Sequence, residues 1–280
     1  MKVGIVGLGL MGASFAKTLH AKNVAEVYGT DLNDEVVQKA TSSRIVDGRL
    51  DLQNACEVDL MVVAVYPRNF RQAVEPFLPK LKSGAIVTDF CGIKRGVMQQ
   101  MQQFAQTYPQ LFFAGSHPMA GSEYVGIEHA VSTLFNKASA ILVPCSQNEE
   151  KQEFLKNFYL SLGFGEVVVC DADFHDGMIA YTSQLCHVVS NAFIKNSCAE
   201  KHSGFSAGSY KDLTRVARLN SRMWAELMTD NRDKLCEELS QLITNLQKYL
   251  VALEQGDEEK LFALLEEGNL RKVQIDARRK

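Results

Sequence analysis

The stretch KVGIVGLGLMGASFAKTLHAK, residues 2–22, decides the fold of the first half of this 280-residue chain. Its first part, KVGIVG, is a short run of mainly β-branched residues that ends in glycine, which is typical of a buried strand. The segment 11–22 has the periodicity of a helix. Between them GLGLMG places glycines in the pattern G-x-G-x-x-G, at Gly7, Gly9 and Gly12. We therefore expect a strand, a tight glycine turn and a helix at the start of the chain.

These glycines predict a dinucleotide site. Such a turn lets a ligand approach the backbone closely, with a pyrophosphate at the helix N-terminus. Asp31 ends the next predicted strand, about 20 residues after the last glycine, as in dinucleotide-binding folds. A carboxylate there accepts hydrogen bonds from the adenosine ribose and repels a 2′-phosphate, which favours NAD over NADP. The alternative is a glycine turn without a ligand, with Asp31 as a helix cap.

Strand-like and helix-like segments alternate through the first 171 residues. Further strands are predicted at 26–31, 59–65, 85–90, 111–116, 139–144 and 166–171, and helices at 34–43, 68–82 and 95–106. Buried parallel strands read as continuous apolar runs, as these do. Their alternation with helices is typical of a doubly wound sheet. We expect an α/β Rossmann domain with a mainly parallel sheet over residues 1–171.

Beyond Asp171 the strand signals stop. Helices are predicted over 174–198, 221–256 and 257–274. An apolar stripe at helical spacing follows the second of these segments: Leu235, Leu239, Leu242, Leu246, Leu250 and Leu253. We expect residues 172–280 to form an all-helical domain, and its stripe to be either core or a homodimer interface.

Composition excludes several classes of function. The formal net charge is −3, with no basic face that would suit nucleic acid. The longest apolar runs are only strand-sized, and glycines interrupt the N-terminal run, so neither a membrane span nor a signal peptide is predicted. The seven cysteines include no C-x-x-C pair, which indicates reduced thiols and no metal site. We expect a cytoplasmic protein.

A candidate catalytic histidine lies in HPMAGSE, residues 117–123. His117 follows a predicted strand, on a loop at the carboxyl end of the sheet, where open α/β sheets bind ligands. An imidazole has a suitable pKa to accept a hydroxyl proton as hydride leaves. The alternative is a loop histidine with local hydrogen bonds. In TDFCGIKRG, after the preceding strand, Asp89 and Lys94 are either turn residues or line the nicotinamide side of a cleft.

The helical half offers further candidates. Arg215 suits an acidic substrate, because a guanidinium binds a carboxylate in a bidentate manner. It also fits a surface pair with Asp212, and Arg218 is a competing candidate. His187 and Gln184 lie one helical turn apart on the predicted helix. A lone histidine on a helix is more often structural than a ligand-binding residue.

Together these stretches resemble the TyrA family, the prephenate and arogenate dehydrogenases. The similarity covers GLGLMG with Asp31, the string HPMAGSE, and D-x-T-R at 212–215 followed by Asn220 and Trp224. The resemblance implies a Rossmann domain joined to a helical dimerisation domain. It implies the oxidative decarboxylation of prephenate to 4-hydroxyphenylpyruvate with NAD⁺, and arogenate, which would give tyrosine, is the nearest alternative.

The resemblance also assigns roles to residues. His117 would be the base on the 4-hydroxyl group of the substrate, and Arg215 would bind a substrate carboxylate. Glu123 and Gly208 fall at pocket positions, and His187 lies on the helix that faces the substrate side chain. Lys94 would line the cofactor site.

Two positions depart from the family pattern. Relatives often carry a serine, which assists the base, where this chain has Gly92. Either a neighbour such as Ser116 takes that role, or the base is positioned less tightly. Relatives also often carry a histidine where this chain has Gln184. We see no added mutase or regulatory segment and expect a monofunctional enzyme. Two rivals stay open: a β-hydroxyacid dehydrogenase that uses Lys195, and a non-catalytic NAD-binding sensor.

Overall fold

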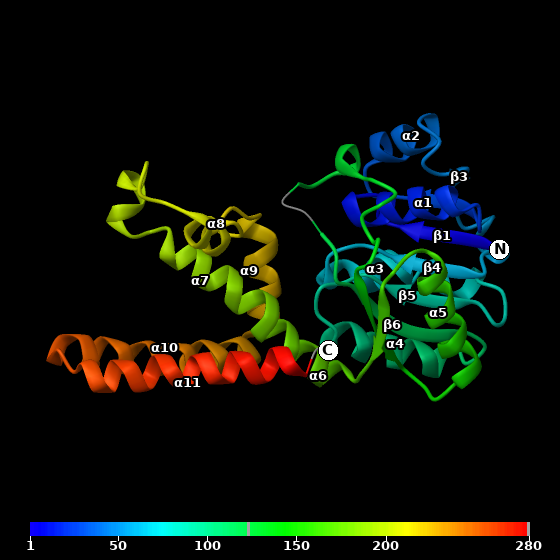
Figure 1. Ribbon diagram of the computed structural model, residues 1–280. Helices are drawn as coiled ribbons and strands as arrows, with labels where there is room; N and C mark the ends of the chain where they lie inside the picture. The colour runs from blue at the N-terminus through cyan, green and yellow to red at the C-terminus, as the bar shows by residue number, and fades with distance from the viewer. Residues whose placement is uncertain (122–123, 279–280) are drawn as a thin grey trace. The chain divides into compact units, whose positions relative to one another are not determined.

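A computed structural model describes residues 1–121 and 124–278 (Figure 1). The chain forms two compact units, Met1–Asn231 and Arg232–Lys280. The first contains a sheet with its helices and a shorter helical segment, and the second is a pair of long helices. Within the described residues, no helix is both long and apolar enough to cross a membrane.

The eight strands of the sheet lie in the order β3-β2-β1-β4-β5-β6-β7-β8. Every neighbouring pair is parallel except β6 and β7, which are antiparallel. This confirms the predicted doubly wound, mainly parallel fold. The strands are β1 (Lys2–Val6), β2 (Glu26–Thr30), β3 (Gly48–Arg49), β4 (Leu60–Val63), β5 (Ile86–Asp89), β6 (Phe112–Pro118), β7 (Ser139–Pro144) and β8 (Glu166–Val169).

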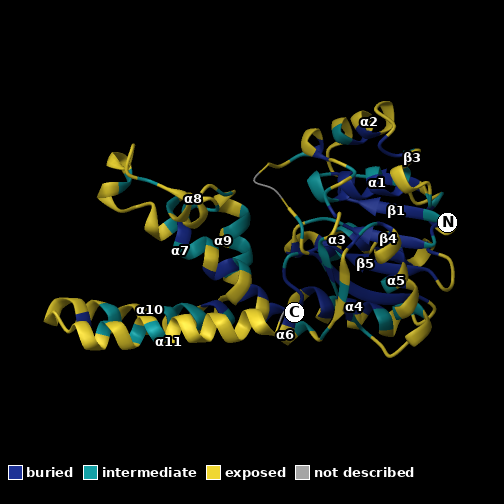
Figure 2. Cartoon of the chain, viewed as in Figure 1, coloured by how far each residue is buried: buried dark blue, intermediate teal, exposed yellow. Residues whose placement is uncertain are grey.

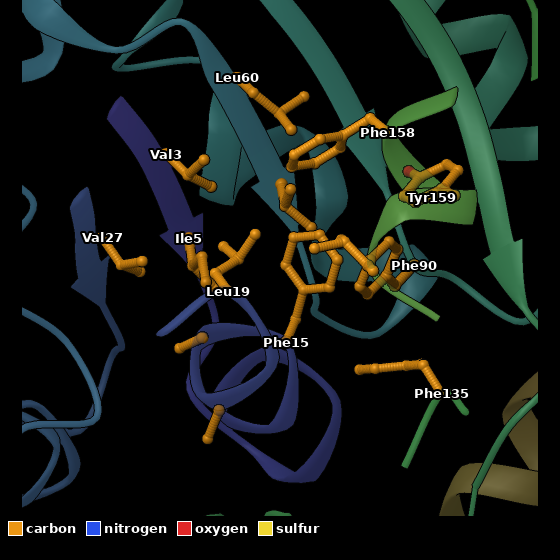
Figure 3. Close-up of a cluster of buried hydrophobic side chains, with 14 of the residues drawn as sticks. Val3, Ile5, Phe15, Leu19, Val27, Leu60, Phe90, Phe135, Phe158 and Tyr159 are labelled. Carbon is orange, nitrogen blue, oxygen red and sulfur yellow. The ribbon is translucent and has the colours of Figure 1, made fainter. Parts of the chain in front are cut away.

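Helices and apolar side chains cover both faces of the sheet. The helices of this part are α1 (Leu10–Lys22), α2 (Asp34–Ser42), α3 (Phe70–Val74), α4 (Arg95–Thr107) and α5 (Glu149–Ser161). Side chains of α1, α2 and α5 form one buried cluster with the strands, and those of α3 and α4 form the other. Figure 3 shows Phe15 of α1 among the side chains of the first cluster. The centroids of the Phe15 and Phe90 rings lie 5.0 Å apart, in an edge-to-face arrangement. Such burial supplies most of the stability of a fold.

The helical segment of the first unit begins with one long, interrupted helix. It consists of α6 (Ala172–Ile179), a π-helical turn (Ala180–Gln184) and α7 (Leu185–Phe193), and is followed by α8 (Gly208–Thr214) and α9 (Ser221–Asp230). Helix α6 starts where the sequence stops being strand-like, because the Asp171 side chain accepts the N–H of Phe174 and caps the helix. The predicted helix over 174–198 is thus present but ends at Phe193.

Two local predictions are corrected, and one helix was not predicted. The helix expected over 68–82 ends at Val74, because Pro76 and Pro79 lack the N–H groups that would continue it. Helix α5 has no counterpart among the predicted elements. The segment 221–256 forms two helices rather than one, because the helix is interrupted between Asp230 and Arg232, at the fully buried Asn231.

The second unit pairs α10 (Arg232–Gln255) with α11 (Glu258–Ala277). Asp257 caps α11 by accepting the N–H of Lys260, and the hydroxyl of Tyr249 donates to the Leu264 carbonyl at 3.1 Å. Much of the predicted leucine stripe is not buried in a single chain: Leu246, Leu250 and Leu253 are 57%, 55% and 61% exposed. Figure 2 shows the exposed residues along both helices. Apolar rows of this kind usually contact another protein surface.

Candidate active site

The glycine turn after β1 has the geometry of a dinucleotide site. Gly7 has φ = +94°, and a Cβ there would lie 2.4 Å from the carbonyl oxygen of Ala64. A Cβ on Gly12 would lie 1.9 Å from the carbonyl oxygen of Gly7, so the helix packs directly on the strand. A Cβ on Gly9 would meet nothing within 4 Å, which leaves its backbone open to a ligand. These are the three separate roles that glycines have in such a turn.

Asp31 lies beside this turn, directly after β2. Its carboxylate accepts the N–H of Leu8 at 2.8 Å and the N–H of Asn33 at 3.0 Å. The first of these bonds ties the carboxylate to the glycine turn itself. The glycine turn and the carboxylate therefore lie next to each other. A dinucleotide with a free ribose 2′-hydroxyl needs this arrangement, because its pyrophosphate binds at the turn and its ribose at the carboxylate.

We expect Asp31→Asn to weaken NAD⁺ binding and to reduce its advantage over NADP⁺ at least about tenfold, which corresponds to about 1.4 kcal/mol. The amide still accepts the N–H of Leu8 but no longer repels a 2′-phosphate. The measurement is the dissociation constant of each cofactor by titration calorimetry. Asp34→Asn is the control, because Asp34 is exposed and pairs with Arg49. An unchanged ratio in Asp31→Asn would contradict the assignment.

His117 lies within β6, and not on a loop as predicted. Antiparallel pairing with β7 extends the strand, so that His117 is in register with Ile141. The ring is still at the carboxyl end of a parallel pair, because β5 and β6 run in the same direction. Its Nδ1 lies 2.9 Å from Nε2 of His175.

The partner histidine belongs to a network that the sequence did not reveal. His175 and Asp176, on α6, are each only 2% exposed. Nδ1 of His175 lies 2.7 Å from Oδ1 of Asp176. The same carboxylate accepts the backbone N–H of Lys94 at 2.7 Å and of Arg95 at 2.9 Å, at the start of α4. The signal available in the sequence was the pair His175–Asp176 just after the last strand, within a segment predicted to be helical.

Lys94 is buried beneath this end of the sheet. It is fully inaccessible, and its Nζ lies 2.5 Å from Oδ2 of Asp89 and 2.9 Å from the carbonyl oxygen of Cys91. Gly115 makes room for it, since a Cβ there would lie 3.1 Å from Cδ of Lys94. This ammonium pairs with Asp89, and its charge lies near His117. A contact of Lys94 with the cofactor stays a prediction.

The site favours a neutral His117 and an ionised Asp176. Burial lowers the pKa of His117 well below its usual range, and the charges of Lys94 and His175 lower it further. Burial also lowers the pKa of His175, although Asp176 opposes this. For Asp176, burial raises the pKa, but hydrogen bonds from His175, Arg95 and Lys94 outweigh burial and leave it lowered. A neutral imidazole is the form that accepts a proton.

The structure does not bring the Ser116 hydroxyl to His117. Successive side chains of a strand point to opposite faces. The fully buried Ser116 hydroxyl instead lies 2.8 Å from Oγ1 of Thr88 and 2.7 Å from the hydroxyl of Tyr159. Its predicted role beside the base is therefore corrected to a structural one. At Gly92 a Cβ would meet only the Leu227 side chain, at 3.6 Å, so there is space for a small side chain.

The predicted substrate-binding residues of the helical segment form a second group. His187 donates from Nδ1 to the carbonyl of Val216 at 3.0 Å, and its ring lies 3.8 Å from that of Trp224, centroid to centroid. Burial lowers the pKa of His187, and the nearby exposed Arg215 lowers it further. Arg215 and Asp212 form no ion pair in the part of the chain that the structure describes. Gly208 is the first residue of α8, and Glu123 lies outside the described residues.

Comparison with known proteins shows which family the chain belongs to. The family model "Prephenate dehydrogenase, nucleotide-binding domain" matches residues 15–168, and "Prephenate dehydrogenase, dimerization domain" matches residues 171–267. The chain belongs to the prephenate dehydrogenase family. This family membership confirms the resemblance that the sequence motifs indicated.

Individual members of the prephenate dehydrogenase family align over most of the chain. It is 30% identical to the cyclohexadienyl dehydrogenase of Zymomonas mobilis, over 91% of this chain and 89% of that protein. It is 28% identical to the prephenate dehydrogenase of Bacillus subtilis, over 92% and 71%. Among solved structures, prephenate dehydrogenase from A. aeolicus in complex with hydroxyphenyl propionate and NAD⁺ superposes with a TM-score of 0.82 at 25% identity, over 98% of both chains.

Proposed function

We propose that this protein catalyses the NAD-dependent oxidative decarboxylation of prephenate to 4-hydroxyphenylpyruvate. The observation that carries the proposal is a partly exposed, neutral His117 at the carboxyl end of the same sheet that carries the glycine turn and Asp31. Family membership supports it, and so does the A. aeolicus relative, whose structure holds NAD⁺ and an aromatic acid.

The residues divide the chemistry among them. When bound, NAD⁺ supplies the acceptor for the hydride that leaves C4 of the substrate. Nε2 of His117 takes the proton of the 4-hydroxyl group, since Nδ1 is engaged with His175. Loss of CO₂ then makes the ring aromatic, which is intrinsically favourable, so the protein mainly aligns the substrate and accepts one proton.

We also propose that the helical segment binds the substrate. The Arg215 guanidinium would pair with a substrate carboxylate, and Glu123, Gly208 and His187 would line the pocket. The exposure of Arg215 supports this assignment, as does the ring of His187 held firmly nearby. The corresponding division into a nucleotide-binding domain (1–171) and a helical domain (172–280) is supported by the two family models, which meet between residues 168 and 171.

The test is the initial rate of NADH or NADPH formation with prephenate and with arogenate, each with NAD⁺ and NADP⁺. We expect turnover of prephenate with NAD⁺. Preference for arogenate would retain the mechanism and change the substrate, an outcome to which the cyclohexadienyl dehydrogenase relative gives some support. Cofactor binding without any turnover would identify the sensor and overturn the proposal. Lys195→Met is a useful control, because Lys195 is exposed and acts only in the rival β-hydroxyacid reaction.

The protein is proposed to act as a homodimer through its helical domain, and a cytoplasmic location stays a prediction. The exposed leucines of α10 and the matched dimerization domain support the dimer. We expect analytical ultracentrifugation to give twice the chain mass of 31.1 kDa. Leu250→Asp combined with Leu253→Asp should shift the protein to monomer, whereas Gln247→Asp on the same helix should not. A monomeric wild type would contradict the dimer.

A further inference from the structure

We propose that Asp176, acting through His175, fixes the tautomer of His117, so that the lone pair of the catalytic ring is at Nε2. The proposal deepens the proposed function, because it explains why the ring is ready to accept a proton. It makes His175 and Asp176 positioning residues, which act on the substrate only through His117.

The positions of the protons follow from the carboxylate end of the network. Asp176 is ionised and only accepts hydrogen bonds, so Nδ1 of His175 carries the proton at 2.7 Å. A neutral His175 then has its lone pair at Nε2. Because that atom lies 2.9 Å from Nδ1 of His117, the proton between the rings belongs to His117. The second nitrogen of His117, Nε2, is therefore unprotonated.

The carboxylate is fixed from several directions, so it cannot turn away from His175. Two backbone N–H groups at the start of α4 donate to it, as does Nε of Arg95 at 3.3 Å. The amide of Asn231 donates to the Asp176 carbonyl at 2.9 Å and accepts from Nη2 of Arg95 at 3.0 Å. Asn231 also donates to Gln184 at 2.9 Å, in the π-helical turn. Buried networks that are satisfied in this way favour one arrangement.

The network also balances charge during the reaction. Lys94, the residue just before α4, lies near His117 with Asp89 as its partner, and Arg95 contacts Asp176. When Nε2 of His117 takes the hydroxyl proton, the ring becomes a cation near the Lys94 ammonium. The Asp176 carboxylate stabilises that cation through His175, as the carboxylate of a Ser-His-Asp triad stabilises its imidazolium. Without His175, Nδ1 of His117 loses its acceptor, and the proton is free to occupy either nitrogen.

The first test uses ¹⁵N-histidine NMR of the unliganded protein near pH 7.5. The chain has only six histidines, and His117→Asn assigns the signals of His117. We expect the Nδ1–H tautomer of His117 in the wild type. In His175→Leu we expect a mixture of tautomers, and in His175→Gln, whose carbonyl can accept in place of Nε2, we expect the Nδ1–H form again. An Nε2–H form in the wild type would overturn the proposal.

The second test is kinetic. His175→Leu should lower kcat for prephenate by about tenfold to a hundredfold with an unchanged dissociation constant for NAD⁺, and His175→Gln should recover most of the loss. His20→Leu is the matched control, since His20 lies 3.0 Å from Asp47 in a partly exposed pair elsewhere in the same unit. Equal kcat in His175→Leu and wild type would overturn the proposal. If the wild type turned over no prephenate but showed the Nδ1–H form of His117, the proposed function would fail and the tautomer assignment would stand.

Discussion

Replacing His117 with asparagine is expected to lower kcat for prephenate by about 10²- to 10⁴-fold, the usual range for loss of a general base. Asparagine is close to the ring in size up to Nδ1 and can still donate to His175, so the local structure is preserved. It has no group at the position of Nε2 to accept the hydroxyl proton. The dissociation constant of NAD⁺ should be unchanged, because the glycine turn and Asp31 are not altered.

The measurement is steady-state kinetics together with cofactor titration. His202→Asn serves as the control, because His202 is exposed and hydrogen bonds only locally, to Ser206 at 3.1 Å. A His117→Asn enzyme with wild-type kcat would exclude His117 as the base.

The same ring determines how activity depends on pH. Only neutral His117 accepts the proton, and burial with Lys94 and His175 lowers its pKa well below 6.5. Activity should therefore persist as the pH falls through 6.5 and decline only when the pH reaches the lowered pKa. The readout is kcat/KM against pH. An acid limb at or above pH 6.5 would show that the surroundings of His117 do not lower its pKa in the free enzyme.

Replacing Lys94 with methionine should lower the free energy of unfolding by about 3–5 kcal/mol, the cost of removing one partner of a buried ion pair. The Asp89 carboxylate would stay inaccessible to water with no cation beside it. In the folded fraction, the acid limb of activity should move to higher pH, because a charge that lowers the pKa of His117 is gone.

Urea unfolding measures the effect on stability. Lys82→Met is the matched control, since Lys82 pairs with Asp59 at 2.6 Å in a partly exposed position where such pairs contribute about 1 kcal/mol or less. Lys94→Met combined with Asp89→Asn should recover part of the loss, because the unpaired charge is removed. A loss in Lys94→Met no larger than in Lys82→Met would contradict this account.

What could be predicted from the sequence was local. The glycine turn and Asp31 depend on a strand, a turn and a helix that are adjacent in the chain, so their spacing alone was informative. His117 was found because the end of a parallel strand is a favoured place for ligands. By contrast, His175 lies 58 residues away from His117 and reaches it only through the packing of α6. No periodic pattern reports such a contact.

The errors near His117 have equally physical causes. Ser116 was expected beside the base because it is adjacent to His117 in sequence. Strand β6 is longer than predicted and includes both residues. Adjacent side chains on a strand point to opposite faces of the sheet, so Ser116 points away from the base. For Lys94 the sequence left two interpretations open, a turn residue or a residue that lines the nicotinamide side of the cleft. Its burial was not predicted, and lysines are rarely buried. The sequence clue to its burial was Gly115, whose missing side chain leaves the necessary space.

The capping of α4 by Asp176 has a consequence for protein engineering. A residue from the helical segment completes the first turn of a helix in the nucleotide-binding fold and also orients the base of that fold. The two parts are therefore not interchangeable modules. A chimera that joins this nucleotide-binding part to a foreign helical segment would inherit the cofactor turn intact. Its histidine, however, would have no defined protonation pattern unless the new segment supplied a carboxylate and a second ring at the same places.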